Sequence, residues 1–331
     1  MAVQIKHNRD FEIDYAQVDQ LSPLVRRVIC KNPGPFTFKG TATFLLGAGQ
    51  TAVIDPGPLY EPHLEALLAA LGPDETVAHV FITHTHSDHS PGAAWIKERT
   101  GATVYGYGPH GKVKADDPDD KVDFSGYISA EEKSKYDKEY DDIPPELKRE
   151  GPDLAFQPDE KLTDNDVVRG DGWTMTAVHT PGHCSNHLCY SLAEEETLFT
   201  GDHVMGWATS VVGPPDGSMG HYLDSLRKLL PRPDRRYRPT HGPAVEDPIA
   251  YVQSFIDHRE DREAQILGHL DGGPKRIADI VPIMYEGYDK RLWYPAAGSV
   301  YAHMLHLVES GRIVADTDEA KLRSVYRLAG R

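Results

Sequence analysis

The chain has 331 residues, of which 39% are hydrophobic and 26% charged, and a formal net charge of −16. This composition excludes an unfolded chain and gives room for one large domain and a smaller one. No run of about 18 apolar residues occurs, and residues 1–14 are charged rather than signal-like, which argues against membrane insertion and secretion. The three cysteines, Cys30, Cys184 and Cys189, suggest no disulfide framework, so we expect a reduced, cytoplasmic protein.

The first part of the chain alternates between predicted strands and helices. Residues 43–46 and 51–54 are typical of a hairpin, and the apolar run 77–83 predicts a buried strand. Residues 103–105 predict another strand. Between the hairpin and the buried strand, one apolar stripe predicts a helix that stops at a Gly-Pro pair. The stripe consists of Leu64, Leu67, Leu68 and Leu71. This alternation indicates an α/β layered architecture.

Directly after the strand 77–83, six residues carry three imidazoles and one carboxylate. They are His84, Thr85, His86, Ser87, Asp88 and His89. Neutral imidazole and carboxylate are the side chains that hold zinc and similar divalent ions. One histidine would indicate only a polar turn, but four ligand-type side chains this close together indicate a metal site. Ser90 as a cap, Pro91 at the first position and Gly101 beyond the last turn predict that a helix follows.

Residues 111–170 interrupt the alternation. The stretch 112–169 contains 18 acidic and 10 basic residues, which is half of the formal net charge. We interpret 111–170 as an acidic insertion, which is either a lid over the site or a solvated surface loop. In a lid, four aromatic side chains could face the substrate: Phe124, Tyr127, Tyr136 and Tyr140.

Three further strand-like segments each lead into a motif with a histidine or an aspartate. The segments are 173–178, 197–200 and 236–238, and the residues that follow them are His183, Asp202 and His241. Beyond these motifs the pattern changes to helical periodicity, which predicts a second domain. Its expected helices are 248–267, 277–281 and 300–307, and its expected strands are 312–315 and 322–328.

His84-x-His86-x-Asp88-His89 resembles the signature of the metallo-beta-lactamase superfamily, and the later motifs follow in that superfamily's order. They are His179-Thr180-Pro181-Gly182-His183, Phe199-Thr200-Gly201-Asp202-His203 and Pro239-Thr240-His241-Gly242. The resemblance implies two divalent metal ions. One would take His84, His86 and His183, the other Asp88, His89 and His241, and Asp202 would bridge them. Zinc is the expected metal, with manganese or iron as alternatives, because all three accept imidazole and carboxylate.

The same resemblance implies an architecture. Residues 1–248 would form a four-layer αββα sandwich with the metals at one sheet edge. Residues 249–331 would form a small, mostly helical winged-helix-like domain, as in the beta-lactamase-like protein 2 group. Two segments resemble that group in particular: Gly201-Asp202-His203-Val204-Met205-Gly206 and His258-Arg259-Glu260-Asp261-Arg262-Glu263.

Two classes of function stay open. The first is a binuclear hydrolase, in which a metal-bridging hydroxide attacks an ester, thioester, lactone or amide and Asp88 is the catalytic carboxylate. The second is a metal-dependent endoribonuclease or phosphodiesterase. Residues 249–331 hold 11 basic and 12 acidic residues, whereas nucleic-acid modules usually show a basic face, so we favour a small-molecule substrate. A mononuclear iron oxygenase would need only the first ligand set, and the intact second set argues against it.

Other side chains are expected to support this site. The resemblance implies that Asp55 supports the metal loop by hydrogen bonding, and His179 and His203 are expected to act through hydrogen bonds from behind the ligands. Cys184 is expected to be a buried thiol, and His110 to be solvated or in the core. Trp207, His221 and Tyr222 are expected to line the pocket. Aromatic side chains cluster in the C-terminal domain, which favours a role for this domain as a substrate cover or as a contact in a homodimer. They are Tyr285, Tyr288, Trp293 and Tyr294.

Overall fold

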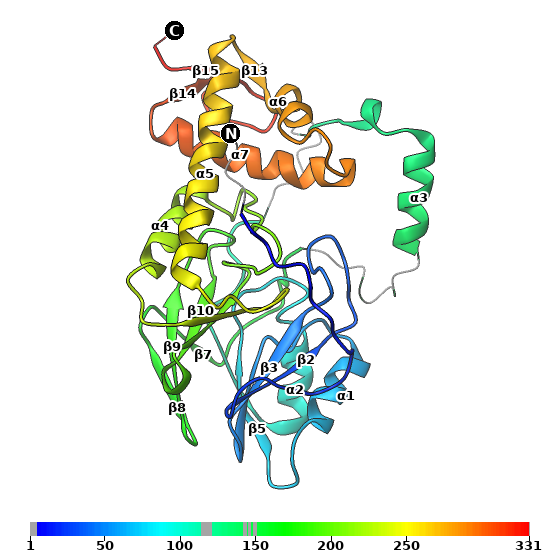
Figure 1. Ribbon diagram of the computed structural model, residues 1–331, viewed down its shortest axis with the longest axis vertical. Helices are drawn as coiled ribbons and strands as arrows, with labels where there is room; N and C mark the ends of the chain where they lie inside the picture. Colours follow the sequence, from blue (N-terminus) through cyan, green and yellow to red (C-terminus); the bar gives the residue numbers. More distant parts are fainter. Residues whose placement is uncertain (1–4, 114–120, 142–143, 145–146, 148–150, 331) are drawn as a thin grey trace.

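The computed structural model describes residues 5–113, 121–141, 144, 147 and 151–330, and the side chains of these residues outside 136–141. Within these ranges two large β-sheets pack face to face, helices cover both outer faces, and a smaller unit lies at one end (Figure 1). The predicted α/β fold, a four-layer αββα sandwich with a small, mostly helical C-terminal domain, is confirmed.

The first sheet arranges seven strands of the described chain in sequence order. They are β1 (Asp19–Gln20), β2 (Val25–Ile29), β3 (Ala42–Leu46), β4 (Gln50–Ile54), β5 (Thr76–Phe81), β6 (Thr103–Gly106) and β7 (Glu160–Lys161). The predicted hairpin is β3 and β4, while β4 to β7 run parallel. Helices α1 (Glu61–Ala69) and α2 (Gly92–Thr100) bury Leu64, Leu67 and Ile96 against the outer face of this sheet.

The start of α2 differs from the prediction in one detail. Ser90 does not cap the helix, because its hydroxyl donates to the carboxylate of Asp153 at 2.8 Å. Gly101 ends α2 in the left-handed conformation, with φ 73°, as its position predicts. No described helix is long and apolar enough to cross a bilayer.

The second sheet has five strands within the described ranges, in the order β12-β11-β10-β9-β8. They are β8 (Val167–Gly170), β9 (Trp173–His179), β10 (Leu188–Leu192), β11 (Thr197–Gly201) and β12 (Arg236–Pro239). Large aromatic side chains fill the space between the two sheets, and burying each contributes about 1.5–3 kcal/mol. Among them are Phe44, Phe81, Trp173, Tyr190 and Phe199. Helices α4 (Met219–Leu229) and α5 (Pro248–Asp271) cover the outer face.

The strands bring their carboxyl ends to one edge of the sandwich. β4 and β5 are parallel, and so are β11 and β12. Because β10 is antiparallel to both β9 and β11, the strands β9 and β11 also point the same way. The loops that follow β9, β11 and β12 therefore lie at one edge of the second sheet, and contacts of His86 with His183 and of His89 with Asp202 join them to the loop after β5.

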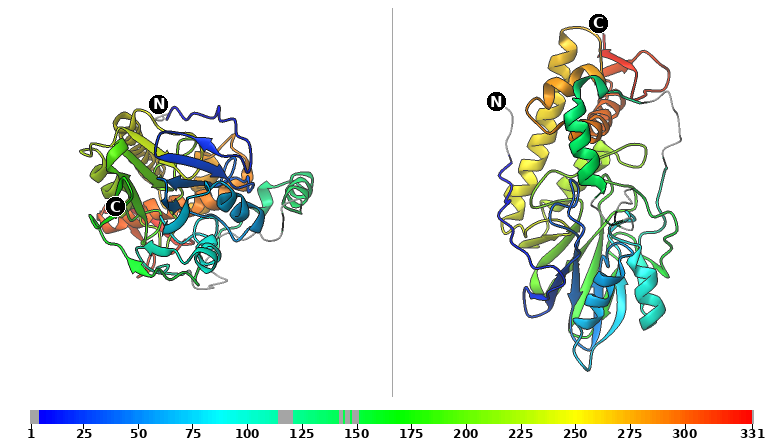
Figure 2. Two further views of the ribbon diagram at one scale, coloured as in Figure 1. Left: turned by 90° about the horizontal axis from the view of Figure 1, so that it is seen from below. Right: turned by 90° about the vertical axis from the view of Figure 1, so that its right-hand side faces the viewer.

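The C-terminal unit has its own apolar core. Helices α6 (Ile277–Met284) and α7 (Trp293–Glu309) pack with a small sheet whose described strands are β13 (Lys275–Arg276), β14 (Ile313–Ala315) and β15 (Val325–Leu328). Helix α5 joins this unit to the sandwich: Phe255 lies in the core under the second sheet and Ile266 in the C-terminal core. Figure 2 shows α5 running the length of this junction. The boundary at 248/249 stays a prediction.

The predicted insertion 111–170 extends too far toward the C-terminus. Its final part forms β7 and β8, which belong to the two sheets. Phe124 does not face the substrate, because its fully buried ring lies in the C-terminal core, 5.7 Å from the ring of Trp293. Tyr127 is 52% exposed and also contacts Trp293. Helix α3 (Ala130–Asp141) stands apart from the sandwich in Figure 1, and the side chains of Tyr136 and Tyr140 lie outside the described residues.

Candidate metal centre

Three imidazoles converge at the edge of the sandwich. His84 and His86 come from the loop after β5, and His183 comes from the turn after β9. His86 Nδ1 lies 2.8 Å from His84 Nε2 and 3.0 Å from His183 Nε2. Burial holds the pKa of His84 and of His86 well below the usual range and also lowers that of His183, so these rings are neutral at pH 7. Neutral imidazole nitrogens aimed at one point are suited to a metal ion.

A second group lies beside the first. His241 Nε2 is 3.1 Å from Asp88 Oδ2, and His89 Nε2 is 3.4 Å from the same oxygen. Burial alone would lower the pKa of His89, but the carboxylates of Asp88, Asp202 and Asp55 outweigh it and raise that pKa well above its usual value. This group therefore combines negative oxygens with ring nitrogens that must lose a proton before a metal can bind.

Asp202 lies between the two groups. Its Oδ1 is 3.4 Å from His241 Nε2 and 3.6 Å from His89 Nε2, whereas its Oδ2 is 3.8 Å from His183 Nε2. One carboxylate thus faces both groups. Gly201 permits this placement, since its φ is 50° and a Cβ there would lie 2.6 Å from His187 Nε2 and 2.8 Å from Thr83 Oγ1.

Unpaired buried atoms test whether these residues fit metal ions. His89 Nε2, His241 Nε2 and Asp202 Oδ1 are buried and make no hydrogen bond of good geometry among the described residues, although oppositely charged groups lie 3.1–3.6 Å away. Buried polar atoms are otherwise almost always paired. Three sets of side chains could hold a metal ion, and the unpaired atoms belong to two of them, where a cation would satisfy all three atoms. The sets are His84, His86 and His183; His84, His89 and Asp202; and Asp88, His89 and His241.

Contacts from behind fix the orientation of the rings. The Nδ1 atoms of His183 and His241 lie 2.5 Å from the Val211 carbonyl and 3.2 Å from the Gly40 carbonyl. Each ring therefore donates Nδ1–H outward and turns Nε2 into the site, where Nε2 is the ligand atom once the ring is neutral. His89 Nδ1 lies in the same way 2.9 Å from Asp55 Oδ2.

Asp55 connects the loops of both sheets. It follows β4 with φ 48°, a conformation that non-glycine residues rarely adopt. Besides contacting His89, its buried carboxylate accepts hydrogen bonds from the Thr83 amide at 2.8 Å, the Thr83 hydroxyl at 2.7 Å and the Thr240 hydroxyl at 3.0 Å. Asp55 thus holds the loop after β5 against the loop after β12.

Replacing Asp55 by Asn should lower the free energy of unfolding by about 2–4 kcal/mol, because an amide cannot accept all four bonds and leaves buried donors unpaired. Urea denaturation followed by circular dichroism measures this change. Asp224→Asn is the matched control, since Asp224 has a side chain 78% exposed on α4. Equal stability of the two variants would contradict this role of Asp55.

The structure brings two unexpected histidines to the site. His187 is fully buried beneath the ligands, with Nδ1 2.9 Å from the Thr180 hydroxyl and Nε2 accepting from the Asp202 amide at 3.2 Å. His110 is not solvated: its Nδ1 lies 3.1 Å from the Thr85 hydroxyl and its ring is 6.0 Å from that of His86. The pairing of Leu188 with His179 across the β9–β10 hairpin is what carries His187 back to the site.

The other supporting residues take separate places. His179 orients its own loop, with Nε2 3.1 Å from the Ser185 carbonyl. His203 is fully buried, but neither ring nitrogen has a hydrogen-bond partner among the described residues, so the expected bond toward the ligands is not seen. Cys184 is a buried free thiol, in the turn rather than on the following strand.

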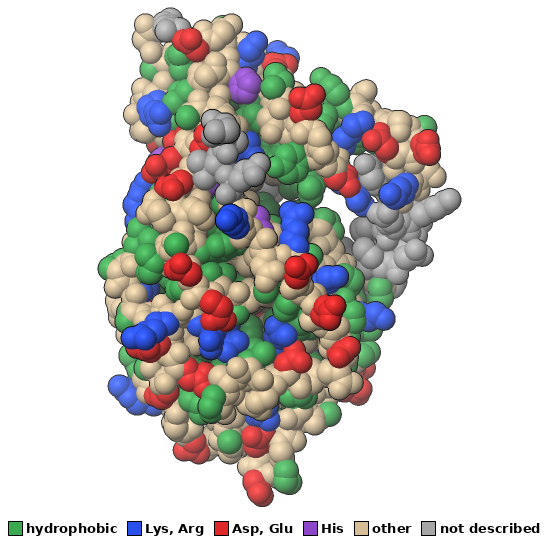
Figure 3. Space-filling model, viewed as in Figure 1, with side chains coloured by type: hydrophobic (Ala, Val, Ile, Leu, Met, Phe, Trp, Pro, Cys, Tyr) green, Lys and Arg blue, Asp and Glu red, His purple; other side chains and the backbone are tan. Residues whose placement is uncertain are grey.

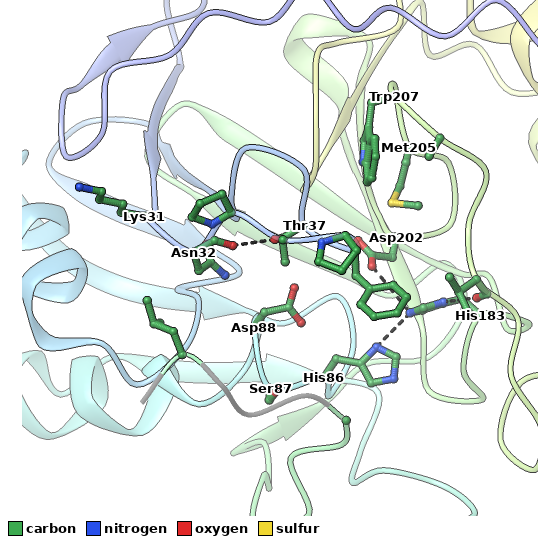
Figure 4. A pocket seen from close by; sticks show the side chains of 18 of the residues that line it. Lys31, Asn32, Thr37, His86, Ser87, Asp88, His183, Asp202, Met205 and Trp207 are labelled. Carbon is green, nitrogen blue, oxygen red and sulfur yellow. Dashed lines mark hydrogen bonds and ion pairs between the residues drawn. The ribbon is translucent and has the colours of Figure 1, made fainter. Parts of the chain in front are cut away.

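A pocket of about 790 Å³ opens beside the converging side chains. In Figure 4, Asp88, Asp202, His86 and His183 lie at its base and Trp207 on its wall. The predicted roles of His221 and Tyr222 are wrong. Both lie in α4, which exposes His221 to solvent and buries Tyr222 completely in the core under the second sheet. The opposite wall, which the sequence analysis did not predict, is formed by Lys31, Asn32, Pro33, Gly34, Pro35, Phe36 and Thr37.

Comparison with protein families agrees with this geometry. The metallo-beta-lactamase superfamily profile matches residues 36–241, a range that includes all seven converging ligand candidates. The chain belongs to the metallo-beta-lactamase superfamily. A beta-lactamase associated winged helix domain matches residues 277–321, within the C-terminal unit. The predicted resemblance to this superfamily with an appended winged helix is confirmed.

Curated members of the superfamily are similar over most of the chain. Beta-lactamase-like protein 2 homolog of Drosophila melanogaster is 30% identical over 304 residues, which cover 89% of this chain and 91% of the relative. An atrochrysone carboxyl ACP thioesterase of Aspergillus aculeatus is 29% identical over 255 residues, covering 76% of this chain and 67% of the relative. The chain is a hydrolase of the metallo-beta-lactamase superfamily.

A solved structure of the superfamily has the same fold over nearly the whole chain. The beta-lactamase domain protein of Burkholderia ambifaria superposes with a TM-score of 0.74 at 21% identity, covering 97% of this chain and 96% of the other. This similarity includes the C-terminal unit, so the sandwich and the winged helix occur together in both proteins.

Proposed function

We propose that this chain is a binuclear metal-dependent hydrolase of acyl substrates, with thioesters as the preferred class among the esters, thioesters, lactones and amides that such a site could cleave. The observation that carries the proposal is the convergence, around Asp202 at the base of one pocket, of three imidazoles on one side and of two imidazoles and a carboxylate on the other. Relatives named as thioesterases support the choice of substrate class.

The chain's own residues would bind and orient the reactants. His84, His86 and His183 would hold one ion and Asp88, His89 and His241 the other, with Asp202 between them. Bound there, two divalent ions, most simply zinc, supply Lewis acidity and lower the pKa of a bound water. Wall residues such as Phe36, Met205 and Val211 would place the acyl group beside the ligands and exclude bulk water.

Asp88 is the proposed catalytic carboxylate. Its side chain is 23% exposed and lines the pocket, whereas the neighbouring ligand side chains of His89 and His241 are no more than 1% exposed. The nearby His89 and His241 outweigh the effect of burial and hold the pKa of Asp88 well below its usual range, so it is ionised at pH 7. In thioester hydrolysis a bond forms between the water oxygen and the acyl carbon while the carbon–sulfur bond breaks. Asp88 would accept the water proton and pass it to the sulfur.

A matched set of substrates tests the proposed function. One hydroxyacyl group is offered as an ester, a thioester and an amide and as its own lactone, and single-stranded RNA is added for the nuclease alternative. We expect the highest kcat/KM for the thioester. Metal-dependent cleavage of RNA alone, with affinity falling steeply as salt rises, would instead support the endoribonuclease alternative.

A further inference from the structure

A second hollow continues the metal pocket toward the C-terminal unit. It measures about 290 Å³ and shares Gly34, Pro35 and Trp207 with the pocket. Its other walls come from an N-terminal segment, the loop after β2 and the segment before α7. The residues are Arg9, Phe38, Asp289, Arg291 and Leu292. We call these eight residues the side groove. The face in Figure 3 is hollowed between the C-terminal unit and the sandwich.

The floor of the side groove is preformed. Phe38 has φ 56°, and the loop closes on itself because the Phe38 amide donates to the Gly34 carbonyl at 2.9 Å. The ring of Phe38 stacks on Trp207, with centroids 4.7 Å apart and planes at 11°. Trp207 in turn packs on Gly242, where a Cβ would lie 2.9 Å from its ring, and Gly242 directly follows His241. The stacked rings of Phe38 and Trp207 therefore form an apolar wall that leads away from the metal centre.

The far side of the side groove carries positive charge. Arg9 and Arg291 line it together with one carboxylate, that of Asp289, in a chain with a net charge of −16. Asp289 orients the guanidinium of Arg291, accepting from Nη2 at 2.6 Å and from Nε at 2.9 Å. Arginine is well suited to phosphate, because its planar fork donates several hydrogen bonds to phosphate oxygens.

We propose that the side groove binds the phosphate-bearing arm of a thioester substrate whose acyl group lies in the metal pocket. This inference rests on the proposed function and names its substrate class: acyl thioesters of phosphopantetheine, as in coenzyme A or on a carrier protein. The slender arm would lie along Phe38 and Trp207, and its phosphate would meet Arg9 and Arg291. The winged helix unit thereby becomes part of the substrate site, because Arg291 precedes α7 of that unit.

Two substrates with one acyl group test the side groove. One is the coenzyme A thioester, and the other is the N-acetylcysteamine thioester, which lacks the phosphates. For the double variant Arg9→Gln and Arg291→Gln, the ratio of kcat/KM between the first and second substrates should fall about tenfold or more, as two charge-assisted hydrogen bonds are lost. The matched control is Arg169→Gln, because Arg169 is exposed on β8, outside the side groove, and should leave the ratio unchanged.

The outcomes separate the two proposals. The side groove is overturned if, in the double variant, kcat/KM relative to the N-acetylcysteamine thioester changes for neither the coenzyme A thioester nor the carrier-protein thioester. Hydrolysis of neither thioester by the wild-type chain overturns the proposed function itself. The same acyl group on a carrier protein is the third substrate, and a fall in kcat/KM for coenzyme A, the carrier protein or both supports the side groove and identifies the source of the phosphate. Arginine-dependent cleavage of single-stranded RNA without thioester cleavage contradicts both proposals.

Discussion

Asp88→Asn is expected to lower kcat/KM for the preferred substrate by about 10²–10⁴-fold. The substitution keeps the shape of the side chain but removes the charge that His89 and His241 face at 3.4 and 3.1 Å. It therefore removes a ligand charge and the proposed proton acceptor together. Initial rates, with folding checked by circular dichroism, measure the effect.

Asp224→Asn is the control for this variant, because it removes an exposed carboxylate from α4 and should keep wild-type rates. A rate for Asp88→Asn within a factor of two of wild type would remove Asp88 from the mechanism. It would also mean that the second ligand group, Asp88, His89 and His241, supplies no catalytic carboxylate.

His183→Ala is expected to lose metal and activity together. His183 supplies one of three imidazole nitrogens in the first group and contacts Asp202, so its loss opens this group to water. Changing a residue that only supports a ligand typically costs about 10–100-fold in metal affinity, and removing a ligand should cost at least that. The melting temperature should fall as well, because a bound metal stabilises the folded state.

His221→Ala is the matched control, since His221 is an exposed histidine on the neighbouring α4. Metal content by elemental analysis, activity and thermal melting are compared for the two variants and the wild type. Full metal content in His183→Ala would contradict its assignment as a ligand. Equal losses in both variants would show that any histidine change in this region acts through folding.

The ligand candidates could be predicted because each lies in a loop that follows a strand. Parallel strands of one sheet carry their carboxyl ends to a common edge, so the local patterns at 77–83 and 236–238 each predict a loop at a sheet edge, one with His84 and one with His241. The packing of the two sheets then brings the two loops together. The resemblance to the superfamily then assigns the motifs to two metal ions, with Asp202 between them. In the structure, the carboxylate of Asp202 faces both groups of side chains.

Residues positioned by helix phase or by distant packing could not be predicted this way. Tyr222 follows the bridging motif in sequence, but α4 begins at Met219 and its rotation buries Tyr222. Phe124 lies in an acidic segment, yet it packs against Trp293, far along the chain. A histidine such as His187 reaches the site only through the pairing of β9 with β10.

The pocket wall formed by residues 31–37 depends on similar long-range contacts. Its Pro- and Gly-rich sequence indicates a loop, and only the fold places this loop opposite Trp207. The stacking of Phe38 on Trp207 joins this wall to the residue beside His241. Substrate contacts are therefore less visible in the sequence than metal ligands, whose chemistry restricts their residue types.

The metal content of the purified protein, measured by elemental analysis alongside activity, tests the central claim most directly. The arrangement around Asp202 predicts about two divalent ions per chain, loss of hydrolysis on chelation, and recovery when zinc or another suitable divalent ion is returned. Full hydrolytic activity in protein shown to be free of metal would contradict the account.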